Sequence, residues 1–174
     1  IPWSINQHGD SFYISERVGT IAAITKDGKV THVEVKLSSG LSKASEAGLL
    51  GFVLKNDFTD SKEAFAYYTY DRNGEAFNRV VTIKLENDAW QETEMHLDDI
   101  PTGNIHHGGR LEIGPDELLY VTVGDAGNPD NAQDATSNNG KILRLKVDGT
   151  FDIYSTGHRN PQGLAWNEDG TLYE

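Results

Sequence analysis

The chain has 174 residues and no cysteine, and 15 basic against 27 acidic side chains give it a formal net charge of −12. This balance argues against a nucleic-acid-binding surface, and the absence of cysteine excludes disulfides and thiolate zinc sites. No run approaches the roughly 20 apolar residues that a membrane-spanning helix needs. With 37% hydrophobic residues and 18 glycines, the composition predicts one globular, turn-rich domain.

A pair of short strands recurs along the chain. In each copy a hydrophobic strand leads into a turn with an aspartate, and a second strand with a tyrosine follows. The first strands begin near Trp3, Phe52, Leu111 and Leu164. The tyrosines of the second strands lie 55, 52 and 53 residues apart, at Tyr13, Tyr68, Tyr120 and Tyr173. Alternating hydrophobic runs supply outer strands at residues 19–24, 30–37, 79–85 and 142–147.

This pattern predicts an all-β fold. Residues 42–50 come nearest to a helical stripe, and their glycines argue against a helix. Four short strands in about 50 residues are typical of a propeller blade, and complete propellers have about 4 to 8 blades. We therefore expect residues 1–174 to form one partial propeller domain of about three blades and the start of another, closed by further C-terminal blades or by another chain. A β-sandwich with a chance tyrosine spacing is the alternative.

Two glycine-containing strings combine flexible backbone with titratable or cationic side chains. His106 and His107 precede two glycines in the first string, and Arg159 and Asn160 precede a proline in the second. Such backbone lets a side chain reach a ligand without crowding its neighbours. The alternatives are turn histidines and an arginine that pairs with a nearby carboxylate. Since adjacent residues of a strand face opposite sides, we expect that the two histidines do not ligate one metal together.

Five motifs follow one another in a recognisable order: Glu46–Phe52, His106–Leu111, Gly124–Ala126, Gly140–Leu145 and Gly157–Gly163. Together they resemble the glucose/sorbosone dehydrogenase family, and the match runs through essentially the whole chain. The resemblance implies a soluble quinoprotein that holds pyrroloquinoline quinone (PQQ) on a six-bladed propeller. It also implies an extracellular or periplasmic location.

The resemblance further implies oxidation of aldose sugars at C1 to the lactone, with hydride transfer to the quinone. His106 matches the family's general base, and Asp125 matches the carboxylate that orients its imidazole. A neutral histidine, with an unperturbed pKa of about 6.5, is suited to take up a proton. Arg159 and Asn160 match the family's cofactor-binding pair. A cation beside a quinone oxygen stabilises the charge that develops there. Glu46 falls where relatives present a polar side chain to the sugar; a solvated loop carboxylate is the alternative.

Calcium is also implied by the resemblance, with ligands beyond Glu174. Residues 125–140 are rich in Asn and Asp but lack the spacing of an EF-hand loop, so we expect no metal site within this chain. Ile105 stands where the glucose-specific branch has an acidic residue, which favours the broader aldose branch. Relatives carry a longer connection between Thr150 and Phe151, so the chain is shorter there.

Two other functions stay open. One is a calcium-dependent lactonase-type propeller hydrolase, which needs several inward-facing carboxylates. The other is a non-catalytic propeller that binds a sugar or a protein. For the dehydrogenase the expected partners are an aldose substrate and an electron acceptor that the sequence does not specify.

Overall fold

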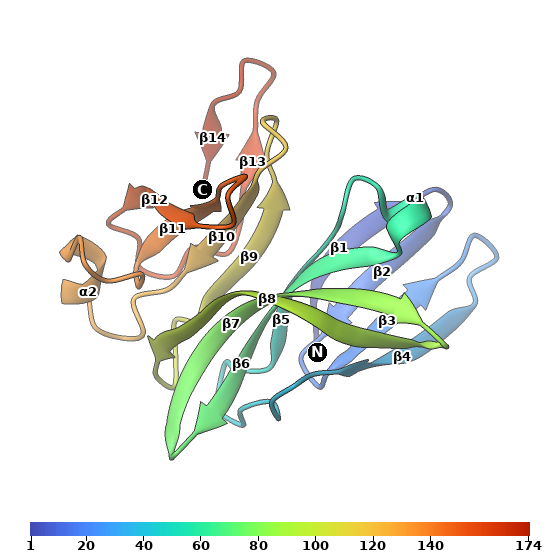
Figure 1. Ribbon diagram of the computed structural model, residues 1–174, viewed down its shortest axis with the longest axis horizontal. Coiled ribbons are helices and arrows are strands. Elements are labelled where there is room, and N and C mark those ends of the chain that lie inside the picture. The colour runs from blue at the N-terminus through green and yellow to red at the C-terminus, as the bar shows by residue number, and fades with distance from the viewer.

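The computed structural model describes residues 1–174 and consists almost entirely of β-strands (Figure 1). Unit 1 comprises β1 (Pro2–His8), β2 (Ser11–Glu16), β3 (Thr20–Ile24) and β4 (Val30–Lys36). Unit 2 comprises β5 (Leu49–Leu54), β6 (Glu63–Arg72), β7 (Glu75–Glu86) and β8 (Ala89–Thr102). Unit 3 comprises β9 (Gly108–Ile113), β10 (Leu119–Val123), β11 (Lys141–Leu145) and β12 (Phe151–Thr156). A hairpin of β13 (Ala165–Trp166) and β14 (Leu172–Tyr173) follows.

The predicted strand repeat is confirmed. The four regularly spaced tyrosines lie in β2, β6, β10 and β14, which is the second strand of each unit and of the final hairpin. The two helices, α1 (Phe58–Ser61) and α2 (Asp130–Gln133), have four residues each, and residues 42–50 form no helix. No helix is long and apolar enough to cross a membrane. The all-β prediction is therefore confirmed, whereas the number of blades in a complete ring stays a prediction.

The sequence did not reveal β8, although it is the longest strand. Its acidic side chains at Glu92, Glu94, Asp98 and Asp99 interrupt the hydrophobic alternation. Its register against β7 also shifts at three places, which breaks the regular two-residue period. Such a strand is stabilised by its hydrogen bonds to the neighbouring strand and by packing, and no local hydrophobic pattern identifies it.

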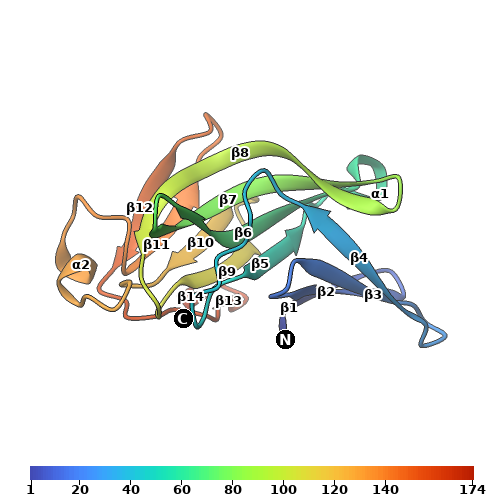
Figure 2. The same ribbon diagram turned by 90° about the horizontal axis from the view of Figure 1, so that it is seen from below.

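Units 1 and 2 join into one eight-stranded sheet. The outermost strands β4 and β8 pair in parallel, with Val35 opposite Trp90 and Lys36 opposite Gln91. The first strands of the three units lie beside one another, β5 between β1 and β9 (Figure 2). Gly51 permits this approach, because a Cβ atom there would collide with the Gly109 carbonyl of β9.

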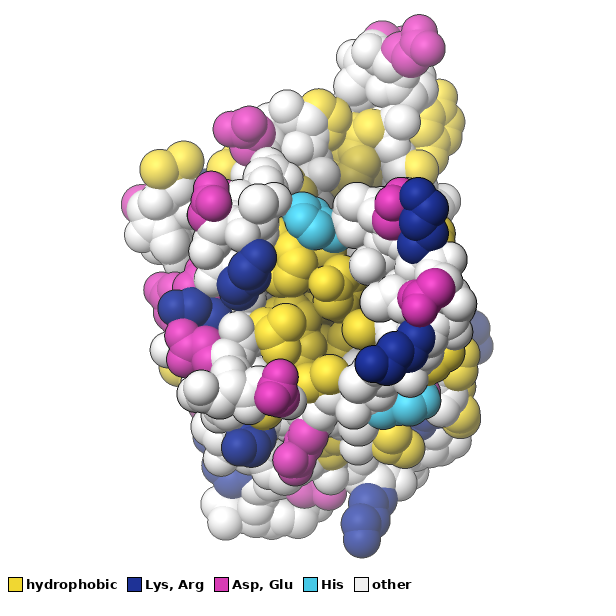
Figure 3. Space-filling view, turned by 90° about the vertical axis from the view of Figure 1, so that its right-hand side faces the viewer, with side chains coloured by type: hydrophobic (Ala, Val, Ile, Leu, Met, Phe, Trp, Pro, Cys, Tyr) yellow, Lys and Arg dark blue, Asp and Glu magenta, His cyan; other side chains and the backbone are white.

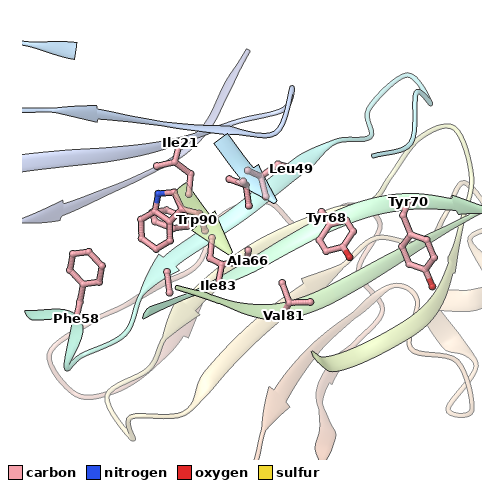
Figure 4. Close-up of a cluster of buried hydrophobic side chains, with 12 residues drawn as sticks. Ile21, Leu49, Phe58, Ala66, Tyr68, Tyr70, Val81, Ile83 and Trp90 are labelled. Carbon is pink, nitrogen blue, oxygen red and sulfur yellow. The ribbon is translucent and has the colours of Figure 1, made fainter. Parts of the chain in front are cut away.

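Two hydrophobic clusters fill the spaces between the units. One packs unit 1 against unit 2 around Trp90, whose ring is 5.4 Å from that of Phe52 and 6.1 Å from that of Phe58 (Figure 4). The other packs unit 2 against unit 3. Successive side chains of β6 serve both, since Tyr68 lies in the first cluster and Tyr67 in the second. Burial on both faces explains why β5 and the middle of β6 read as nearly continuous apolar runs.

Figure 3 shows the side of the molecule that lies on the right of Figure 1. Figure 3 shows hydrophobic side chains gathered in a hollow on this face, with charged side chains and histidines around it. Phe12 and Val30 of unit 1 are among the exposed apolar residues of the chain. The candidate site is built from the connections between strands rather than from this hollow.

Candidate active site

Residues from four connections between strands come together at the candidate site. Glu46 lies between β4 and β5, His106 between β8 and β9, Asp125 between β10 and β11, and Asn160 between β12 and β13. Hydrogen bonds between these segments span 60, 19 and 52 residues of sequence. The structure therefore assembles in space the side chains that the sequence distributes over three units.

His106 and Asp125 form a buried pair. Nδ1 of His106 lies 2.7 Å from Oδ1 of Asp125, and the two side chains are 10% and 2% exposed. The Asp125 oxygen also accepts the backbone N–H of Gly127 at 2.8 Å, which fixes the carboxylate. An ionised carboxylate can only accept, so Nδ1 carries the proton and Nε2 has a free lone pair. The imidazole is thereby prepared to accept a proton at Nε2.

The backbone around this pair depends on glycine and on a left-handed residue. His106 has a φ of 62°, and its backbone N–H donates to Oε2 of Glu46 at 2.8 Å. A Cβ atom at Gly124 would collide with the carbonyl of His106, so only glycine allows the start of the β10–β11 connection to pass this close. A non-glycine residue with positive φ is uncommon and costs free energy, which the Glu46 hydrogen bond helps to offset.

His107 faces a different set of partners. Its Nδ1 lies 3.0 Å from Oγ1 of Thr102, and its carbonyl accepts the hydroxyl of Tyr67 at 2.8 Å. The side chain is 1% exposed, and its Nε2 has no partner. Burial lowers the pKa of His107 to about 4. Both histidines lie in the connection before β9 and not within a strand, so the strand alternation on which the prediction about a shared metal rested does not apply here, and that prediction stays untested.

Arg159 and Asn160 lie beside the His106–Asp125 pair. Oδ1 of Asn160 accepts the backbone N–H of Gly108 at 2.9 Å, which leaves its amide N–H groups available. The Arg159 carbonyl accepts the N–H of Asp125 at 2.8 Å, whereas its guanidinium is exposed and joins none of the chain's ion pairs. The alternative of an arginine paired with a nearby carboxylate is therefore not what the structure contains. A small cavity of about 200 Å³ lies against Asp125 and Arg159.

Glu46 is half-buried and holds the backbone of His106, which excludes the alternative of a simply solvated loop carboxylate. The connection that carries it, residues 42–44, also lines a cavity of about 640 Å³ together with residues 101–104 and the β6–β7 hairpin. Whether Glu46 itself contacts a sugar stays a prediction.

Sequence reasoning missed two polar residues behind the site. Lys141 is the first residue of β11, and its side chain is fully buried. Asn139 is also buried, and its amide donates to the carbonyls of Pro101 and Gly124. The one signal in the sequence was the place of Lys141 in the motif Gly140–Leu145, and Asn139 comes directly before that motif. No group of three or more His, Cys, Asp or Glu side chains is arranged to hold a metal ion.

Comparisons with a family model and with known proteins show what this chain is similar to. The sequence model of the glucose/sorbosone dehydrogenase family matches residues 1–174. Quinoprotein glucose dehydrogenase B of Acinetobacter calcoaceticus is 30% identical over 166 residues, which is 73% of this chain and 35% of the relative. The aldose sugar dehydrogenase YliI of Escherichia coli strain K12 is 30% identical over 142 residues, 70% of this chain and 38% of that protein.

A solved structure shows the same relationship in three dimensions. The PQQ-bound form of aldose sugar dehydrogenase from Streptomyces coelicolor superposes with a TM-score of 0.87 at 33% identity, over 98% of this chain and 55% of that one. The chain thus spans about half the length of this structure, and less of the two curated relatives. By sequence and by fold, the chain belongs to the glucose/sorbosone dehydrogenase family.

Proposed function

We propose that this chain carries the catalytic base of a PQQ-dependent dehydrogenase that oxidises aldose sugars at C1 to the lactone. The observation that carries the proposal is the 2.7 Å contact between His106 and Asp125, which leaves Nε2 of His106 free to accept a proton. Family membership supports sugar oxidation, and the PQQ-bound relative supports the identity of the cofactor. An extracellular or periplasmic location belongs to the same proposal.

The residues beside the base suit a quinone that carries carboxylates and adjacent carbonyl oxygens. Such a ligand needs cationic and N–H donors that no protein group already uses. Arg159 offers a guanidinium outside every ion pair, and Asn160 offers its amide N–H groups while Gly108 fixes the orientation of the amide. These two residues would hold the cofactor, which when bound supplies the acceptor for the hydride that leaves C1 of the sugar.

The chain's own residues perform the proton chemistry. Nε2 of His106 accepts the proton of the anomeric hydroxyl as the C1–O bond becomes a carbonyl. Asp125 keeps the Nδ1 proton in place and stabilises the imidazolium that forms. Glu46 holds the backbone N–H of His106, so the ring meets the substrate in one orientation. A positioned base of this kind contributes about 10²- to 10⁴-fold to the rate.

Calcium enters the proposal from the family resemblance, with ligands outside residues 1–174. Without several convergent carboxylates among the described residues, the geometry gives no support to a calcium-dependent lactonase centre within this chain. A binding propeller without catalysis has no observation in its favour that the dehydrogenase proposal does not explain equally well.

The test is dye-coupled oxidation of a panel of aldoses by the purified protein, with and without added PQQ and calcium. We expect turnover only with PQQ, and its loss in His106→Ala while PQQ binding, followed by absorbance, is retained. His32→Ala is the matched control, because this histidine is exposed and far from the site in sequence. Full activity of His106→Ala would overturn the assignment. Lactone hydrolysis without PQQ would favour the hydrolase, and sugar binding without turnover would favour the binding propeller.

A further inference from the structure

Three of the connections that build the site meet at residues 139–141. The Asn139 amide donates to the Pro101 carbonyl at 2.8 Å, at the end of β8 and before the segment of His106. It also donates to the Gly124 carbonyl at 3.1 Å, next to Asp125. The Gly140 carbonyl accepts the N–H of His158 at 3.1 Å, next to Arg159. The short segment 139–141 therefore contacts the backbone next to Asp125 and next to Arg159, and also the end of β8, five residues before His106.

Lys141 lies at the centre of this junction and is 0% exposed. Its ammonium group donates to three backbone carbonyls, those of Asn131 at 2.7 Å, Ala132 at 3.1 Å and Asn139 at 2.8 Å. An ammonium has three N–H donors, and each has one acceptor here. A neutral amine would leave one of these carbonyls without its donor.

This arrangement is unusual for a buried lysine, because no carboxylate takes part in it. Moving an ammonium out of water costs free energy, and burial accordingly lowers the pKa of Lys141. Asp134 is the acidic residue whose charge opposes this shift. In some proteins such a costly group is kept because its hydrogen bonds define a conformation that an apolar side chain could not define.

The conformation in question is that of the β10–β11 connection, residues 124–140. Asn131, whose carbonyl accepts from Lys141, donates its own side-chain N–H to the carbonyl of Asp125 at 3.0 Å. Asp125 in turn binds Nδ1 of His106. Two residues thus separate the buried ammonium from the imidazole, and each step is a hydrogen bond of 3.0 Å or less.

We propose that Lys141 is a positioning residue of the candidate site, whose ammonium holds the β10–β11 connection so that Asp125 stays on Nδ1 of His106. The catalytic meaning of this role rests on the proposed function, whereas the structural statement can be tested in the protein without substrate or cofactor. A displacement of reacting groups by about 1 Å can cost about 10²-fold in rate. We expect Lys141→Met, which keeps the length and removes the charge, to lower turnover to that extent.

The first experiment observes the His106 imidazole directly by NMR in ligand-free protein. An Nδ1 proton held by Asp125 gives a downfield signal that exchanges slowly with water, and His106→Gln identifies it. We expect this signal in the parent protein and in the charge-removing control Lys29→Met, because Lys29 is exposed. In Lys141→Met we expect it to be broadened or lost while the circular dichroism spectrum is retained. A persistent signal with parent-like exchange would overturn the proposal.

A second pair of variants decides the matter if Lys141→Met does not fold. Asn131→Ala keeps the buried ammonium and removes only the side-chain link to Asp125, so it should weaken the same signal without unfolding the protein. Lys141→Ala should regain the signal with added n-propylammonium but not with n-propanol, which has the wrong charge and too few donors. No effect of Asn131→Ala together with no rescue of Lys141→Ala would contradict the inference.

The two proposals can fail separately. An altered imidazole signal in the Lys141 variants, in a protein that shows no sugar oxidation, would support the positioning role and reject the dehydrogenase. Oxidation that requires His106 but is unchanged in a folded Lys141→Met would reject the positioning role and support the dehydrogenase.

A folded Lys141→Arg should give an imidazole signal intermediate between those of the parent protein and Lys141→Met, since a planar guanidinium cannot match three carbonyls placed around a single nitrogen.

Discussion

Oδ1 of Asp125 accepts a hydrogen bond from Nδ1 of His106 at 2.7 Å, although the two residues are 19 positions apart and lie in different connections between strands. The same carboxylate oxygen accepts the backbone N–H of Gly127, so it is held from two directions. This fixes both the tautomer and the rotation of the imidazole. The hydrogen bond to Asp125 thus determines which nitrogen of His106 can act as the base of the proposed reaction, and the position of His106 in a motif does not.

Asp125→Asn should lower kcat/KM for aldose oxidation by about 10²- to 10⁴-fold, since an amide can donate to Nδ1 and favour the wrong tautomer. Steady-state kinetics with PQQ would measure the loss. Asp130→Asn, an exposed carboxylate of the same connection, is the control and should retain parent activity. If both variants behaved like the parent protein, Asp125 would have no part in the chemistry.

Arg159→Gln should weaken PQQ binding by about 10- to 100-fold, because it removes a charge-assisted donor to an anionic ligand. Titration of the protein with PQQ would give the two dissociation constants. The melting temperature should stay near that of the parent, since the guanidinium is exposed and outside every ion pair. Unchanged affinity would remove Arg159 from the cofactor site, and Lys29→Gln serves as the exposed cationic control.

The buried His107 should make the fold sensitive to acid. Its pKa is lowered to about 4 in the folded chain, against about 6.5 when unfolded. Between these values the unfolded chain binds a proton that the folded chain does not, so the free energy of unfolding falls as the pH falls from about 6.5 to about 4. The contribution is about 3 kcal/mol, complete above that window and lost below it.

Denaturant unfolding at pH 7 and pH 4.5 would check this contribution. His107→Gln should reduce the difference in unfolding free energy between the two pH values by most of that amount, because glutamine does not titrate. His32→Gln is the control, since this histidine is exposed. An identical pH dependence in His107→Gln and the parent would show that His107 is not buried in its neutral form.

Trp90 should be the most sensitive position of the cluster between units 1 and 2. It is 1% exposed and contacts both Phe52 and Phe58 (Figure 4). Trp90→Ala should lower the free energy of unfolding by about 3 to 5 kcal/mol, as large-to-small core substitutions do. Val147→Ala, at a side chain that is 96% exposed, should change it by less than about 0.5 kcal/mol. Equal melting curves for the two variants would contradict this core.

The sequence by itself determined the unit repeat and most of the strands. Residues alternate between the faces of a strand, so a two-residue hydrophobic period and the recurring tyrosines identify β2, β6, β10 and β14 without tertiary information. Family motifs likewise pointed to His106, Asp125 and Arg159 as residues of one site. Where charges interrupt the alternation, as at Glu92 and Glu94 of β8, the local pattern is lost and the strand was missed.

Only the tertiary structure decided how these residues work together. Glu46 binds the backbone of His106 across 60 residues, and β4 pairs with β8 through two residue pairs that no local pattern encodes. The sequence shows Lys141 only as a member of a motif, whereas the structure places its ammonium among three carbonyls behind the site. Periodicity reports which face of an element a residue occupies, whereas partners far apart in sequence are chosen by packing and by the need to satisfy buried polar groups.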